Sequence, residues 1–341
     1  MIDALSLPDG PDHGFRRVAI VFAGGPAPAA NAVISTAAIS FLRNGIEVIG
    51  IFNGYANLAD YSSDRPLREG EDYIVVDHSF LNRSRNSQGV VIGTSRRNPG
   101  MEVLEAAHIE DEGRCASLRA VCEGLASLDV EALVSIGGDD TLKTANKLLL
   151  YQQHAVEESR RIPVVHVPKT IDNDYPGIDF TFGYFTTVHT LAAEITNLLH
   201  DAEACRSYFV VEAMGRSAGW LAYGAAIAGE ASMVISHEDI AGKYLASEPY
   251  EDPQTGESGT RSVMDVPLVV KRIVRLMRAR KAEGKPFGVV VLSEALAELL
   301  PLESLEGIPR DEHGHLRVAA VEVGRMFAGL VSDAYEEATG E

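Results

Sequence analysis

Two short stretches decide the fold and the chemistry of this chain: Ile136–Lys143, with the sequence IGGDDTLK, and Pro168–Asp174, with the sequence PKTIDND. Each follows a run of apolar residues that is typical of a buried strand. Ligands of open α/β sheets bind where strands end, so we expect Asp139, Asp172 and Asp174 to lie at such an edge. Carboxylates there, beside backbone N–H groups and a lysine, are what a magnesium-assisted phosphoryl transfer needs.

Beyond these stretches, apolar β-branched runs alternate with helical patterns, which predicts repeated βα units. The expected strands are Val18–Ala23, Glu47–Phe52, Ala132–Ile136, Pro163–Val167, Tyr208–Val211, Ser232–Ile235 and Phe287–Leu292. The expected helices are Asn31–Arg43, Gly113–Ser127, Thr141–Gln153, Thr187–Asp201, Trp220–Ala228, Val266–Glu283 and Ala319–Ala338. The polar stretch Ser247–Thr260 is expected to be a surface loop. We therefore expect an α/β fold of two doubly wound domains with mainly parallel sheets, residues 1–182 and 183–341, with the active site in the interdomain cleft.

Composition narrows the class of partner. The 341 residues carry a net charge of −19, which argues against nucleic acid or an anionic membrane as a partner. A local cluster of Arg and Lys, or a bound divalent cation, would still admit a phosphate substrate. We find no apolar run long enough to span a bilayer and no signal peptide pattern. Three cysteines without metal-ligand spacing fit a reducing compartment, so we expect a cytoplasmic protein.

Glycines and aspartates mark two candidate phosphate and metal positions. Gly24 and Gly25 stand between a predicted strand and a predicted helix, where missing β-carbons and a helix N-terminus suit a phosphate. A tight turn explains these glycines equally well. Asp139 is placed to hold Mg²⁺, directly or through water. A helix cap is the alternative for an acidic residue at this position.

The PKTIDND stretch supplies candidate catalytic groups. Asp172 could accept the proton of a sugar hydroxyl as general base, Thr170 could bond the transferred phosphoryl group, and Asp174 could orient Asp172 or the substrate hydroxyl. The alternative is an Asx-turn cluster. Lys169 favours the functional interpretation, because a lysine beside these acids suits a phosphate.

Arginines and one glutamate at other strand ends complete the candidate set. Arg216 could clamp a sugar phosphate in bidentate fashion, and Arg96 lies in a polar loop. For both, an ordinary surface arginine is the alternative. Glu294 follows a predicted strand and could accept hydrogen bonds from hydroxyls.

Taken in order, the segments GGDD, PKTIDND and EAMGRSAGW resemble those of the phosphofructokinase family, from Val18 to about Glu294. The resemblance implies phosphorylation of the 1-hydroxyl of fructose 6-phosphate with Mg²⁺ as cofactor. It implies a donor-binding first domain, a sugar-phosphate second domain and a homodimer or homotetramer. The implied site residues are the general base Asp172 with Thr170 and Asp174 in its loop, the magnesium-associated Asp139, Arg96 at the transferred phosphoryl group, Gly24 in the donor loop, and Met214, Gly215, Arg216 and Glu294 at the sugar phosphate. The family also borrows an arginine from a neighbouring subunit, and Arg206 is near that position, one residue out of register.

Two positions bear on the phosphoryl donor. ATP-using members of the family resemble GGDG and PGTIDND, whereas this chain has Asp140 and Lys169 in place of those glycines, as the pyrophosphate-dependent branch does. Asp140 would place a negative charge near the α-phosphate of a nucleotide, and like charges about 4 Å apart repel by roughly 4 kcal/mol at a surface-like dielectric. Lys169 would add positive charge for a compact anion. We therefore expect fructose 6-phosphate and pyrophosphate as substrates in a reversible reaction.

The chain also departs from the family pattern. Ala29 stands where the donor loop usually has glycine, and the chain stops at Glu341 before a segment that supplies further sugar-phosphate contacts, so the second domain is expected to be truncated. Three alternatives stay open at this point: an ATP-dependent 6-phosphofructokinase, a GGDG-type kinase of NAD or lipid, and a catalytically inactive sugar-phosphate-binding paralogue.

Overall fold

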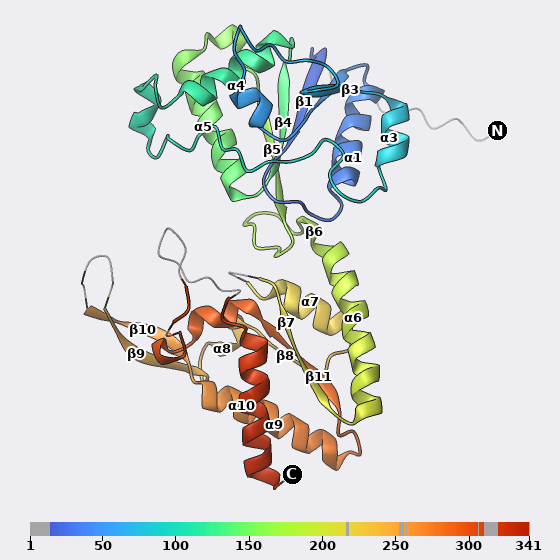
Figure 1. Cartoon of the computed structure of the whole chain (residues 1–341), viewed down its shortest axis with the longest axis vertical. Coiled ribbons are helices and arrows are strands. Elements are labelled where there is room, and N and C mark those ends of the chain that lie inside the picture. Colours follow the sequence, from blue (N-terminus) through green and yellow to red (C-terminus); the bar gives the residue numbers. More distant parts are fainter. Residues whose placement is uncertain are drawn as a thin grey trace, which may run out of the picture. The chain divides into compact units, whose positions relative to one another are not determined.

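The computed structural model (Figure 1) describes residues 14–215, 218–251, 256, 258–305, 307–309 and 320–340. The chain forms two compact units. The first unit comprises Met1–Thr170 and Thr181–Gly183, and the second comprises Ile171–Phe180 and Tyr184–Glu341. Within the described residues, no helix combines the length and the apolar composition that crossing a membrane requires.

The first unit is built on a six-stranded sheet in the order β3-β2-β1-β4-β5-β6. Its strands are β1 (Arg17–Phe22), β2 (Glu47–Ile51), β3 (Tyr73–Val76), β4 (Ala132–Gly137), β5 (Val164–Thr170) and β6 (Phe182–Gly183). All neighbours are parallel except β3, which runs antiparallel to β2. The parallel arrangement brings the carboxyl ends of β1, β4 and β5 to one edge.

Helices cover both faces of this sheet, because the strands are apolar on both sides. Along β1, Ala19 and Val21 belong to the apolar cluster under α2 (Ala56–Ala59), α4 (Ala116–Ser127) and α5 (Asp139–Ala155). Val18, Ile20 and Phe22 belong to the cluster under α1 (Ala30–Arg43) and α3 (His78–Ser84). The alternation of one strand between two cores is what the period of two in a β-strand predicts.

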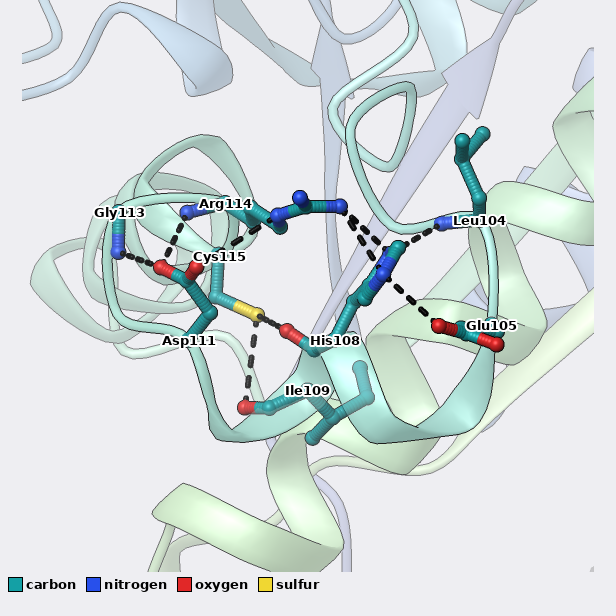
Figure 2. Close-up of polar contacts among 8 residues, drawn as sticks. All are labelled: Leu104, Glu105, His108, Ile109, Asp111, Gly113, Arg114 and Cys115. Carbon is teal, nitrogen blue, oxygen red and sulfur yellow. Dashed lines mark hydrogen bonds and ion pairs between the residues drawn. The ribbon is translucent and has the colours of Figure 1, made fainter.

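A polar cluster shapes the segment that leads into α4 (Figure 2). The Asp111 carboxylate accepts hydrogen bonds from the Gly113 N–H at 2.9 Å and the Arg114 N–H at 3.2 Å. These hydrogen bonds, that of Arg114 above all, hold the pKa of Asp111 below its usual value. Arg114 also reaches His108, in the short 3₁₀ helix η1 (Ala106–Glu110), at 2.9 Å. The segment therefore has a defined path, although it forms no strand.

A second 3₁₀ helix, η2 (Glu158–Arg160), follows α5.

The second unit holds a three-stranded parallel sheet in the order β7-β11-β8. The strands are β7 (Tyr208–Ala213), β8 (Met233–Ile235) and β11 (Gly288–Ser293), with α6 (Tyr184–Cys205) and α7 (Trp220–Ala228) on one face and α9 (Val266–Ala282) and α10 (Val323–Thr339) on the other (Figure 1). Along β11, Val289 and Val291 join the core of α6 and α7, whereas Val290 and Leu292 join the core of α9 and α10. Three short helices follow strand ends: α8 (His237–Ile240), η3 (Glu294–Leu299) and η4 (Leu302–Leu305).

The expected surface loop at Ser247–Thr260 is wrong for the residues that the structure describes there. They form the antiparallel pair β9 (Leu245–Glu251) and β10 (Ser258–Met264). Side chains along β9 alternate between exposed and half-buried, which is strand behaviour despite the polar composition. The Arg261 guanidinium donates to the Leu300 carbonyl at 2.8 Å and thereby fixes β10 to the unit.

The α/β class with mainly parallel sheets is confirmed. The four-residue β3 and the two-residue β6 are short, and neither was predicted from the sequence, although β3 has the apolar sequence YIVV. The last predicted helix, Ala319–Ala338, is observed as α10, which begins at Val323; Ala319 itself lies outside the described residues.

Candidate functional site

The turn after β1 is fixed against a neighbouring loop. Gly24 has φ +86°, in the left-handed region that favours glycine. Its N–H donates to the Ser95 carbonyl at 2.9 Å, and its carbonyl accepts the Thr94 hydroxyl at 2.6 Å. These two hydrogen bonds hold the Gly24 turn beside the loop that carries Arg96. A β-carbon on Gly25 would meet no atom within 4 Å, so the turn leaves open space there.

Lys169 approaches this turn from the end of β5. A β-carbon on Gly24 would lie 3.7 Å from the Lys169 Nζ, and one on Gly138 would lie 3.9 Å from it. Burial, and then the charge of Arg96, lower the pKa of Lys169. Two cations and two glycine turns therefore meet at the carboxyl ends of β1, β4 and β5. Such a place suits a compact, highly charged anion.

The N-terminus of α5 is the third element of this candidate anion site, after the Gly24 turn and Lys169. β4 ends at Gly137, where a β-carbon would collide with the Thr141 side chain, and Gly138 is the N-cap of α5. Asp139 and Asp140 occupy the first turn, where negative charge complements the helix dipole. Both side chains are exposed, and the Asp140 Oδ1 lies 3.6 Å from the Lys143 Nζ.

The donor set for a metal is small. Among the described residues, no group of three or more His, Cys, Asp or Glu side chains is arranged to hold a metal ion. Asp139 is an exposed carboxylate at a helix N-terminus beside the lysine-lined turn. Magnesium is commonly held by one or two carboxylates together with substrate phosphates and waters. The residues present therefore fit Mg²⁺ bound jointly with a phosphate ligand.

Residues that sequence patterns did not single out position the Arg96 loop. The Thr144 hydroxyl donates to Asn98 Oδ1 at 2.8 Å, and the Lys147 ammonium donates to the Gly100 carbonyl at 2.9 Å. Thr144 and Lys147 are three residues apart on α5 and share one helix face. In the sequence, this spacing alone connects the two residues. It predicts no contact with the Arg96 loop unless the loop is known to pass that helix face.

The loop after β5 is a structured turn. Thr170 ends β5, and its carbonyl accepts the Thr181 hydroxyl at 2.7 Å. Asp172 and Asp174 belong to the segment Ile171–Phe180, which groups with the second unit. Between them Asn173 is left-handed, with φ +55°, and its side-chain amide donates to the Asp179 carbonyl at 3.2 Å. Asp172 is partly buried and Asp174 is exposed.

In the second unit, two candidate residues meet because their strands are neighbours. Met214 and Gly215 follow β7, Glu294 follows β11, and Ala213 pairs with Ser293 at the strand ends. The Gly215 N–H accordingly donates to Glu294 Oε2 at 3.3 Å. Gly215 has φ +141°, and a β-carbon there would collide with the Ala218 carbonyl oxygen. The Met214 side chain is largely exposed, and Arg216 lies outside the described residues.

Arg206 lies at the opposite end of β7. It follows α6 in the left-handed conformation, with φ +54°, and its side chain is exposed. The six residues of β7 separate it from Met214 by about 20 Å at the usual rise per residue. Within one chain, Arg206 therefore does not join Met214, Gly215 and Glu294.

Ala29, where the resembling family usually has glycine, is also left-handed. It has φ +62° as the N-cap of α1 and forms no side-chain capping hydrogen bond. For an L-residue this conformation costs roughly 1–2 kcal/mol relative to the right-handed region. The turn therefore keeps the backbone that glycine would adopt, at a cost in strain.

Comparison with known proteins shows the family. The chain is 33% identical over 332 residues to pyrophosphate–fructose 6-phosphate 1-phosphotransferase of Thermotoga maritima, covering 94% of this chain and 68% of that protein. The enzyme of the same name from Amycolatopsis methanolica is 37% identical over 223 residues, 65% of this chain and 56% of its own length. ATP-dependent 6-phosphofructokinase of Corynebacterium efficiens is 31% identical over 307 residues, covering 89% of this chain and 71% of that protein. The chain thus spans about two thirds or less of the length of several relatives that it matches.

Solved structures share the fold. Phosphofructokinase from Saccharomyces cerevisiae matches with a TM-score of 0.62 at 20% identity, covering 94% of this chain and 42% of that one. Pyrophosphate-dependent phosphofructokinase from Nitrosospira multiformis matches with a TM-score of 0.59 at 18% identity, covering 95% and 67%. The sequence model of the phosphofructokinase family matches residues 17–339, almost the whole chain. The chain therefore belongs to the phosphofructokinase family.

Proposed function

We propose that the protein transfers a phosphoryl group from pyrophosphate to the 1-hydroxyl of fructose 6-phosphate, with Asp172 as general base. The observation that carries the proposal is the position of the Lys169 ammonium beside Gly24 and Gly138, with the charge of Arg96 acting on it. This cluster offers positive charge and backbone without side chains to a small anion. The names of the relatives from Thermotoga maritima and Amycolatopsis methanolica support pyrophosphate as that anion.

Each residue has a defined task in this reaction. Asp172 accepts the proton of the sugar hydroxyl as the oxygen attacks phosphorus, and Asp174 orients the hydroxyl or Asp172. Thr170 and Arg96 bond the transferred phosphoryl group, and Lys169, Gly24 and Gly25 hold the departing phosphate. Asp139 would hold Mg²⁺ together with phosphate oxygens, and the ion, when bound, supplies neutralising charge to them.

Asp140 bears on the donor in two ways. Its carboxylate stands in the position of a glycine in ATP-using members, so its bulk opposes a nucleotide. The ion pair with Lys143 at 3.6 Å reduces the charge repulsion that the sequence alone suggested, although an exposed pair compensates only in part. An ATP-dependent reaction is the second candidate function, and the relatives that carry that name support it.

The sugar phosphate is proposed to bind in the second unit, at Met214, Gly215, Arg216 and Glu294. Arg206 would reach this site from a neighbouring copy, because it lies at the far end of β7 in its own chain. The proposal therefore includes a homodimer or homotetramer. The phosphoanhydride bond that breaks and the phosphoester bond that forms are of comparable energy. The pyrophosphate reaction should therefore run in both directions.

The direct experiment compares donors. Purified protein with fructose 6-phosphate and Mg²⁺ receives pyrophosphate or ATP, and fructose 1,6-bisphosphate is measured. Turnover with pyrophosphate and little with ATP is expected, with loss of turnover in Asp172→Asn. Asp140→Gly with Lys169→Gly should weaken the use of pyrophosphate. Turnover with ATP alone would replace the first candidate by the second, and sugar-phosphate binding without product from either donor would favour an inactive binding protein.

A further inference from the structure

The loop between β7 and α7 is held at its far end by a carboxylate that the sequence patterns did not single out. Glu238 lies in α8, and its Oε1 accepts a hydrogen bond from the Gly219 N–H at 2.9 Å. Its other oxygen, Oε2, accepts the Ser236 hydroxyl. Gly219 is the N-cap of α7, so Glu238 fixes the point at which the loop becomes a helix.

The near end of the same loop is held in the same way. The Gly215 N–H donates to Glu294 Oε2 at 3.3 Å. Glu294 follows β11 and Glu238 follows β8, which are neighbours in the sheet. Glu294 and Glu238, which follow adjacent strands, therefore accept the backbone N–H groups of Gly215 and Gly219 respectively. In the sequence, these two glycines stand on either side of Arg216.

The Gly219 end of the loop is closely packed. A β-carbon on Gly219 would collide with Ser236 Oγ, and Ser236 is fully buried. The Asp239 carboxylate accepts the Ser236 N–H at 2.9 Å and the Tyr223 hydroxyl at 2.7 Å, which joins α8 to α7. Glu238 therefore lies in a helix that is hydrogen-bonded to α7.

Glu238 acts as a charged acceptor. Partial burial alone would raise the pKa of Glu238, but the hydrogen bonds from Ser236 and Gly219 outweigh it and hold the pKa below the usual value. A hydrogen bond to an ionised carboxylate is stronger than one between neutral groups.

We propose that Glu238 is a positioning residue of the sugar-phosphate site. It holds the Gly219 N–H at the start of α7, as Glu294 holds the Gly215 N–H, and so limits the movement of the chain that carries Met214 and Gly215. It touches neither substrate nor reacting atoms. What the loop binds rests on the proposed function; that Glu238 fixes the loop does not.

The test uses two substitutions and a matched control in the full chain. Glu238→Ala removes the acceptor, and Glu238→Gln keeps an oxygen that can accept from Gly219. The control is Asp265→Ala, because Asp265 likewise accepts a backbone N–H, that of Leu268 at 3.0 Å, at the N-terminus of α9. Both alanine variants lose one carboxylate-to-backbone hydrogen bond in the same unit, but only one of them lies at the loop.

Two readouts separate positioning from general stability. Amide hydrogen exchange of the peptide covering residues 214–222 should accelerate about tenfold in Glu238→Ala, consistent with a lost charged hydrogen bond, and stay unchanged in Asp265→Ala. The KM for fructose 6-phosphate should rise about tenfold in Glu238→Ala, with kcat and the KM for pyrophosphate unchanged, and Glu238→Gln should restore it.

The outcomes are distinct. Unchanged exchange at residues 214–222 in Glu238→Ala would overturn the proposal, as would faster exchange with an unchanged KM for fructose 6-phosphate. If the unsubstituted protein neither binds nor converts fructose 6-phosphate, the proposed function and the sugar-phosphate role fail together. The exchange measurement then still decides whether Glu238 holds the loop.

Discussion

The Lys169 ammonium lies 3.7 Å from the point where a β-carbon on Gly24 would stand. The lysine ends β5 and the glycine follows β1, so the parallel order of the sheet is what brings them together. In the proposed donor site, the glycine leaves the backbone accessible to an anion, and the lysine supplies the opposite charge.

We expect Lys169→Gln to raise the KM for pyrophosphate by about tenfold to a hundredfold, because hydrogen bonds to charged groups contribute roughly 1.5–3 kcal/mol. Lys143→Gln is the control, since Lys143 pairs with Asp140 on the exposed side of α5. Steady-state kinetics with both substrates measures the effect. Equal rises in the two variants would mean that only the overall charge matters, contrary to the role assigned to Lys169.

Ala29→Gly should stabilise the protein by about 0.5–1 kcal/mol. Removing the left-handed strain gains roughly 1–2 kcal/mol, and the added freedom of glycine in the unfolded chain takes back about 0.5–1 kcal/mol. Ala37→Gly, in the interior of the same helix, should instead destabilise by about 1 kcal/mol. Urea unfolding of both variants is the measurement, and a shift of both midpoints in the same direction would refute the strain at Ala29.

Thr144→Val should loosen the Arg96 loop, because it removes the hydroxyl that donates to Asn98. We expect a loss of about 1 kcal/mol of stability and a fall in kcat. Thr190→Val is matched, since within the described residues the Thr190 hydroxyl donates to the Thr186 carbonyl one turn earlier in its own helix, as the Thr144 hydroxyl also does to the Asp140 carbonyl. If Thr190→Val lowered kcat equally, the link between Asn98 and Arg96 would have no catalytic meaning.

Hybrid oligomers test the sharing of Arg206. Arg206→Ala and Asp172→Asn should each abolish most turnover alone. When the two variants are co-expressed, a shared site predicts that one site in each mixed pair carries neither substitution. Recovery of a substantial fraction of the unsubstituted activity is therefore expected. Mixed oligomers are verified by two affinity tags. If they recover no activity, Arg206 acts within its own chain or takes no part in the reaction.

The cysteines should differ in reactivity with pH. Burial raises the pKa of Cys122 to about 12, with a smaller contribution from Glu123, whereas Cys205 is exposed. Because the thiolate is the nucleophile, iodoacetamide at pH 8 should label Cys205 in the native protein and Cys122 only in urea. The raised pKa of Cys122 contributes stability to the folded state that is fully present below pH 9, and this contribution is lost as the pH rises towards 12. Labelling of native Cys122 at the rate of Cys205 would contradict the burial.

Sequence patterns anticipated the parts of the fold that depend on continuous apolar runs. Strands such as Val18–Ala23 and Phe287–Leu292 lie between two layers of helices, so both faces of each strand are apolar and the run is uninterrupted. β3 was missed although its sequence YIVV is apolar, because it is only four residues long and lies between polar segments. β9 and β10 were mistaken for a loop because their residues are mostly polar and include Pro249, and only the pairing of the two strands reveals them.

Candidate site residues could be named from the sequence where a glycine or an acid follows a strand, since such positions have a local signature. Gly24, Gly215 and Glu294 could be named because of that signature, and Lys169 because of the acids that follow it and the family resemblance. Asn98, Lys147 and Glu238 could not, because each forms a hydrogen bond with a group far away in the sequence. Their roles exist only after folding brings a helix and a loop together.

The pairing of β6 with the end of β5, Lys169 with Phe182 and Thr170 with Gly183, makes Ile171–Phe180 a closed loop rather than a free arm. The entropy lost in closing a loop is incurred when the chain folds, not when a sugar arrives. In the proposed reaction, Asp172 is therefore already confined before the sugar binds, and substrate affinity need not offset the entropy of ordering this loop.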